Sequence, residues 1–257
     1  MAYLYFDESI RDQGEFIVGA LIISDTEVSN EIREQWIAFG LDPDANEYKS
    51  SSIKNGDEIS LRQRDYVGYM VTRSKLALTI LPLNDRRQLG NNLAELIFQL
   101  IKTGLLEESE HSAYVDENIK ISQAYQARLQ EAGVKLFLNS NSATIAGIQL
   151  SDHASHILGS MLLEELGIIK KQVKAGENSG YHPDELFELG FELWANVRYA
   201  LLGKQTYIEG VSPPPDDPAN PYFKIEGYGL HIAPTCPEPL AQSARKRFGI
   251  NYLGCIH

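Results

Sequence analysis

The sequence has few cysteines and no long apolar run. Cys236 and Cys255 are the only cysteines among 257 residues, and their spacing matches neither a disulfide framework nor a zinc pattern. No apolar run reaches the length of about 20 residues that crosses a bilayer. The N-terminus has no basic segment followed by an apolar core, so we expect neither a secretion signal nor a membrane protein. These absences predict a reduced, cytoplasmic protein.

Basic residues are also scarce, and the net charge is −12. Proteins that bind nucleic acids through counterion release carry basic surfaces, so this charge counts against a polyanionic partner. Short basic stretches do occur, around Lys170 and Lys171 and at residues 245–247. Divalent cations bound to carboxylates would also reduce repulsion towards phosphate. The charge therefore argues against a nucleic-acid enzyme without excluding one.

Hydrophobic periodicity predicts strands that alternate with helices. The first two strands are separated by a short polar link and are expected to form a hairpin. We expect strands at residues 3–6, 16–23, 76–81, 113–117 and 134–138, and helices at residues 27–39, 59–73, 86–102, 121–132, 149–166 and 182–203. This order predicts an α/β fold with a mixed central sheet of about five strands flanked by helices.

The C-terminal part differs in composition from the rest. Eight of the eleven prolines lie between Pro213 and Pro239, which favours an irregular, extended segment. We therefore predict a main domain at residues 1–170. Residues 171–257 are expected to form a C-terminal helix and a proline-rich extension packed on the same domain. Such an extension could also contact a protein partner or a second copy of the chain.

Two aspartates occupy similar positions in the predicted strands. Asp7 follows an apolar strand and precedes Glu8, and Asp116 follows another strand and precedes Glu117. If the strands are neighbours, the two aspartates lie close together and raise each other's pKa. Mg²⁺ or Mn²⁺ would make the same cluster favourable, since hard cations prefer oxygen ligands. The alternative is that each aspartate makes a turn or caps the next element.

A third group of polar residues opens the helix predicted from residue 149. Asp152 is expected in its first turn, where the helix dipole favours a carboxylate, with His156 on nearly the same face. That spacing is compatible with metal binding or proton transfer. Small residues such as Ala154 and Gly159 would let the helix approach a sheet closely. Alternatively, His153 and His156 are packing or surface histidines; a zinc site is not expected, because no cysteine accompanies the carboxylates.

Four short motifs, taken together, resemble the domain-of-unknown-function 3800 family, a branch of the ribonuclease H-like superfamily. They occur in the family's order within residues 1–166 and read YLYFDES (3–9), EYKS (47–50), YVD (114–116) and QLSD (149–152). The family pattern has glycine after the first Asp-Glu-Ser, where this chain has Ile10. It also favours small or apolar residues where this chain has Ser151 and His153.

The resemblance implies a ribonuclease H-like fold and a two-metal nuclease or phosphodiesterase that uses Mg²⁺ or Mn²⁺ to activate water. Its expected substrate is nucleic acid. By position, the implied metal ligands are Asp7, Glu8, Asp116 and Asp152, with Glu47 as a further ligand or base and Lys49 as a phosphate contact. His153 and His156 are added as auxiliary residues because of their place on the predicted helix, and not from the resemblance. Two other functions remain open: a non-catalytic binding or assembly module of the same fold, and a hydrolase of small nucleotides.

Overall fold

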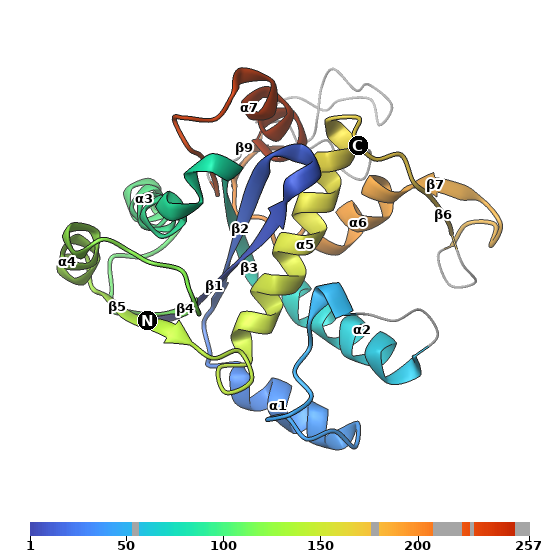
Figure 1. The fold of residues 1–257 in the computed structure, drawn as a ribbon, viewed down its shortest axis with the longest axis horizontal. Helices are drawn as coiled ribbons and strands as arrows, with labels where there is room; N and C mark the ends of the chain where they lie inside the picture. The colour runs from blue at the N-terminus through green and yellow to red at the C-terminus, as the bar shows by residue number, and fades with distance from the viewer. Residues whose placement is uncertain (53–56, 176–179, 208–222, 227–228, 250–257) are drawn as a thin grey trace.

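The computed structural model describes residues 1–52, 57–175, 180–207, 223–226 and 229–249. Its centre is one mixed sheet made of β1 (Ala2–Arg11), β2 (Phe16–Ser24), β3 (Lys75–Pro82), β4 (His111–Asp116), β5 (Val134–Ser140) and β10 (Leu230–Ile232). The strand order is β10-β3-β2-β1-β4-β5 (Figure 1). The sheet has six strands rather than about five, and its helices cover both faces. The predicted α/β architecture is confirmed, and it is consistent with a ribonuclease H-like type of fold.

The first strand is longer than the sequence predicted. β1 stays antiparallel to β2 over its whole length, from Tyr3 opposite Ser24 to Arg11 opposite Phe16. It pairs in parallel with β4 only as far as Phe6. The prediction that the strand ends before its carboxylates is therefore wrong: β2, which is apolar except for its last residue, Ser24, supplies a partner that keeps the polar half of β1 extended.

Helices form a layer on each face of the sheet (Figure 1). One face packs against α1 (Ser29–Ala38), α2 (Glu58–Thr72), α5 (Gly147–Glu165) and α6 (Leu189–Val197), and the other against α3 (Leu89–Thr103) and α4 (Gln123–Glu131). Alternation along β1 divides its side chains between these layers. Tyr5 belongs to the core beneath α5, whereas Leu4 and Phe6 belong to the core beneath α3.

α5 lies close against β1, as its small residues predicted. A Cβ atom on Gly147 would lie 2.4 Å from a ring carbon of Tyr5, and the hydroxyl of Ser151 donates to the backbone oxygen of Tyr5 at 2.8 Å. The helix begins at Gly147 rather than at residue 149. Asp152 therefore lies in the second turn, where the dipole effect invoked above is weak.

The C-terminal part differs most from the prediction. Residues 182–203 do not form one helix: β6 (Gln172–Lys174) pairs with β7 (Leu186–Glu188), and α6 follows. Within the expected irregular extension, β8 (Lys204–Tyr207) pairs with β9 (Phe223–Glu226), β10 joins the main sheet beside β3, and α7 spans Glu238–Ala244. The prolines at residues 213–221 and Cys255 lie outside the described residues.

None of the helices in the described ranges combines the length and apolarity needed to cross a membrane.

Candidate functional site

The pairing of β1 with β4 brings Asp7 and Asp116 together. The last residues paired in parallel are Phe6 and Val115, so the next residue on each strand is one of the aspartates. Asp7 is two residues beyond Tyr5 and Asp116 two beyond Tyr114, and these two rings stack with centroids 5.6 Å apart. Since side chains alternate along a strand, both aspartates face the α5 side of the sheet.

The two aspartates lie in a site with excess negative charge. Burial raises the pKa of Asp7 well above its ordinary value, and the charges of Asp116, Asp152 and Glu8 raise it further. The side chain is nearly enclosed, with 9% of its residue surface exposed. The pKa of Asp116 rises to about 6, mainly through burial, although Lys49 opposes the rise. The site therefore favours a neutralising cation.

Asp152 reaches this site from α5, and Ser50 fixes its orientation. The backbone N–H of Ser50 donates to one carboxylate oxygen at 2.7 Å, and the Ser50 hydroxyl donates to the other at 2.6 Å. The charge of Asp152 still raises the pKa of Asp7. A residue from a loop 102 positions away thus holds the third aspartate beside the first.

The loop at residues 47–50 is tied to α5 by polar contacts. The backbone N–H of Tyr48 donates to the buried side-chain oxygen of Gln149 at 3.0 Å. The ammonium of Lys49 lies 3.4 Å from a carboxylate oxygen of Glu47 and donates to the hydroxyl of Ser142 at 3.2 Å. That hydroxyl donates to Glu47 at 2.5 Å. The loop therefore has a defined position beside the helix.

The ammonium of Lys49 places a positive charge near Asp116 and Asp152. Burial lowers the pKa of Lys49, but the negative charges of Glu47, Asp116 and Asp152 outweigh burial and raise it above its ordinary value. The ammonium is accordingly protonated at neutral pH. Glu47 is held by Lys49 and by Ser142, in the segment between β5 and α5, so its observed contacts are with these residues rather than with Asp7.

Glu8 lies on the other face of β1, as alternation requires once the strand continues. A carboxylate oxygen lies 3.7 Å from the guanidinium of Arg86, in the segment between β3 and α3. The second oxygen, Oε2, is buried without a hydrogen-bond partner. Burial raises the pKa of Glu8. Glu8 thus adds negative charge near Asp7 and leaves one oxygen without a donor.

The two histidines of α5 have different surroundings. The ring of His153 is buried and contacts the Tyr48 hydroxyl at 2.7 Å through Nδ1. Burial lowers its pKa to about 3, which corresponds to the packing role that was the alternative for this residue. Burial also lowers the pKa of His156, and Arg11 adds to this effect while Asp152 opposes it. Of the two histidines, His156 is the one whose pKa responds to the charge of Asp152.

Arg11 is a site residue that sequence reasoning missed. It lies on the same face of β1 as Asp7, and its guanidinium donates to the backbone oxygen of His156 and to the hydroxyl of Ser160. Its Nε atom is buried without a partner. Alternation from Asp7 through residue 9 would have indicated Arg11, but only after the full length of the strand was known.

The donor chemistry of this site fits a hard divalent cation, because every candidate from the strands is a carboxylate oxygen. The raised pKa values of Asp7 and Asp116 agree with that preference. Across the described ranges, no three His, Cys, Asp or Glu side chains form a group that could hold an ion. Both oxygens of Asp152 accept bonds from Ser50 instead.

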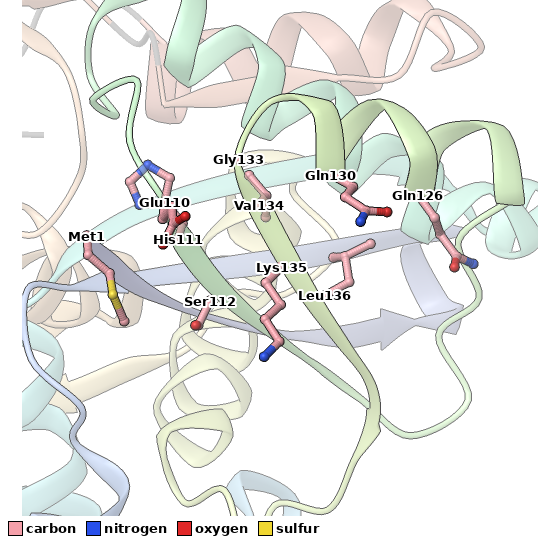
Figure 2. Close-up of a pocket in the computed structure, with 10 residues that line it drawn as sticks. All are labelled: Met1, Glu110, His111, Ser112, Gln126, Gln130, Gly133, Val134, Lys135 and Leu136. Atoms are coloured by element: carbon pink, nitrogen blue, oxygen red, sulfur yellow. The ribbon is translucent and has the colours of Figure 1, made fainter.

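The cavity shown in Figure 2 belongs to another part of the molecule. It has a volume of about 670 Å³ and is lined by residues that include Met1, His111, Gln130 and Lys135. These residues lie at the beginnings of β1, β4 and β5 and on α4. Because the three strands are parallel, all three begin on one side of the sheet, and their carboxyl ends lie on the opposite side. The cavity therefore lies at the other end of these strands from Asp7 and Asp116.

Comparison with models of known protein families found no match, and comparison with curated proteins found no similar sequence. The function is therefore inferred from the site and from the motifs that form it.

Proposed function

We propose that this protein is a divalent-metal-dependent nuclease that hydrolyses phosphodiester bonds of nucleic acid. One observation carries the proposal: Asp7 and Asp116 lie side by side on adjacent parallel strands, with pKa values raised by burial. A divalent cation would remove their repulsion and convert a costly cluster into a favourable one. The resemblance to the domain-of-unknown-function 3800 family, through the same residues, supports this proposal.

The carboxylates have distinct roles in this proposal. Asp7 and Asp116 would hold Mg²⁺ or Mn²⁺ with Asp152 as the third ligand, and Glu8, on the other face of β1, adds negative charge near Asp7. When bound, the metal lowers the pKa of a water molecule and stabilises the leaving oxygen. The hydrogen bonds from Ser50 restrict the rotation of the Asp152 carboxylate.

In this proposal, Lys49 contacts the negatively charged phosphate of the substrate. The ammonium is protonated, and its contacts with Ser142 and Glu47 hold it beside the aspartates. A positioned cation stabilises the negative charge that develops on phosphate in the transition state. Because the whole chain has a net charge of −12, this local charge matters more than it would in a basic protein.

Metal binding tests the proposal directly. Titration calorimetry with Mn²⁺ is expected to give heat of binding for the natural protein and little or none for Asp7→Asn and Asp116→Asn. Asp25→Asn is the matched control, since its side chain is 81% exposed and lies at the other end of β1. Equal Mn²⁺ binding by all four proteins, or by none, would contradict the proposed site.

Cleavage assays then separate the possible functions. Single- and double-stranded DNA and RNA, together with mononucleotides, are incubated with Mg²⁺ or Mn²⁺ and each protein. The proposal expects polymer cleavage that Asp7→Asn and Asp116→Asn abolish and Asp25→Asn retains. Metal binding without cleavage would indicate a non-catalytic binding module. Cleavage confined to mononucleotides would indicate a small-nucleotide hydrolase.

A further inference from the structure

Three aromatic rings form a stacked row across β1, β4 and β5. The rings of Tyr5 and Tyr114 have centroids 5.6 Å apart and planes inclined by 16°. Tyr114 and Phe137 continue the row at 4.7 Å and 11°. The three residues are direct cross-strand partners. The row therefore runs perpendicular to the strands, from the middle of the sheet to its edge.

The row begins in the core and ends at a partly open surface. Tyr5 is fully buried beneath α5, whereas Tyr114 and Phe137 are half-buried. α5 packs mainly over β1 and β2 (Figure 1), and β5 is the edge strand. Among the described residues, the only ring that stacks on Phe137 is Tyr114. The stack thus has an end at the edge of the sheet.

A cation lies beside this end of the row. Lys135 is two residues before Phe137 on the same strand, and its ammonium lies over the Phe137 ring, 4.9 Å from the ring centroid. The lysine is exposed and forms no ion pair within the described part of the chain. A protonated amine beside an aromatic face is a combination found where proteins hold both the phosphate and the base of a nucleotide.

The row is adjacent to the proposed catalytic carboxylates. Tyr114 precedes Asp116 by two residues, which is about 6.6 Å along a strand at about 3.3 Å per residue. Ser112, Tyr114 and Asp116 are all partly exposed on this face. A nucleotide chain that contacts the ring row would therefore have its backbone near Asp116.

The edge itself is unsuited to adding another strand. Asn139 has a φ of 53°, and the pairing of β4 with β5 shifts register between Tyr114 and Asp116. Lys135 places a charge on the same edge. Irregular register and exposed lysine both disfavour edge-to-edge pairing. These features favour a ligand that uses the rings over a second protein strand that uses the backbone.

We infer that Tyr114, Phe137 and Lys135 form a binding platform for single-stranded nucleic acid. The Lys135 ammonium, which lies over the Phe137 ring, moves to a phosphate of the ligand, and an unpaired base stacks on the ring in its place. Single strands are favoured because the bases of a duplex are already stacked and paired, so they have no free face for a ring. If the protein is the proposed nuclease, its substrate is single-stranded nucleic acid. The inference rests on the proposed function for this role, but the binding itself does not require cleavage.

Binding without metal tests the platform separately from cleavage. Fluorescence anisotropy in EDTA measures the Kd of labelled single-stranded DNA and RNA dodecamers and of a blunt duplex. Phe137→Leu keeps apolar volume but removes the ring, and is expected to weaken single-strand binding about 5- to 100-fold. Phe98→Leu is the control, because Phe98 stacks on Tyr125 beneath Arg128 on the other face of the sheet. Its Kd should be unchanged.

Two further measurements keep the test independent of folding effects. Lys135→Ala removes one exposed charge and is expected to reduce the slope of log K against log salt by about 0.7. Photo-cross-linking of an oligonucleotide that contains 5-iodouracil should attach it to the peptide carrying Phe137. Both measurements support the platform even if Phe137→Leu is less stable than the natural protein.

Several outcomes would overturn the platform. These are equal Kd values for Phe137→Leu and Phe98→Leu, tighter binding of duplex than of single strands, or no single-strand binding at all. A natural protein that is dimeric by sedimentation and becomes monomeric in Phe137→Leu would assign this edge to a second copy instead. None of these outcomes affects Mn²⁺ binding at Asp7 and Asp116, so the two proposals fail separately.

Discussion

Replacing Asp116 with asparagine is expected to stabilise the metal-free protein at pH 8. The pKa of Asp116 rises from 3.8 to about 6, and at about 1.4 kcal/mol for each pH unit this difference corresponds to about 3 kcal/mol. The side chain is only partly buried, so solvent screening reduces the effect, and we expect about half of this value. Asparagine retains an oxygen that can accept a hydrogen bond from the next residue.

The sign of the effect depends on pH. Between pH 3.8 and about 6, the folded protein binds more protons than the unfolded chain, so its stability falls as pH rises through this window. Asp116→Asn has no carboxyl group that titrates at this position, so it does not lose this part of its stability as the pH rises. The variant should therefore gain about 1.5 kcal/mol at pH 8, or roughly 3 to 6 °C in Tm, and gain almost nothing below pH 4.

Metal should reverse this order of stability. Urea denaturation in EDTA measures the gain at pH 8, and repetition with Mn²⁺ at about 100 times its Kd should stabilise the natural protein by about 2.7 kcal/mol. Asp116→Asn should gain little from Mn²⁺, and Asp25→Asn should behave as the natural protein does. An Asp116→Asn variant that is less stable in EDTA at pH 8 would refute the reasoning that burial of the charged Asp116 carboxylate destabilises the metal-free protein.

Three other outcomes follow from the contacts around the site. Ser50→Ala removes the hydroxyl hydrogen bond to the charged Asp152 but keeps the one from the backbone N–H, and should lower the free energy of unfolding by about 1.5 to 3 kcal/mol in urea; Ser50→Thr keeps a hydroxyl and should lose much less. Gly147→Ala places a methyl group 2.4 Å from the Tyr5 ring and should lower it by about 1 to 3 kcal/mol; unchanged stability would mean that α5 is not held so closely. His153, whose pKa is lowered to about 3, should keep a neutral ring from pH 8 to pH 5 in nitrogen NMR spectra, and titration near pH 6.5 would contradict its burial.

Local patterns predicted much of the fold because they reflect local physics. The apolar run of β2 and the spacing of leucines in α3 are properties of neighbouring residues, and both elements form close to the predicted positions. The predicted boundaries of strands were wrong where a strand distant in sequence determines them. β1 extends to Arg11 because β2 pairs with it, and β10 is a strand because β3 offers a free edge.

The sequence alone determined the chemistry available to this protein: carboxylates after apolar strands, few basic residues, and an α/β order of elements. Only the tertiary structure decided which side chains meet. Parallel pairing of β1 with β4 brings Asp7 beside Asp116, more than 100 residues apart, and the same register aligns Tyr5, Tyr114 and Phe137 in one row. Strand order and register depend on contacts between distant segments, and no local periodicity encodes them.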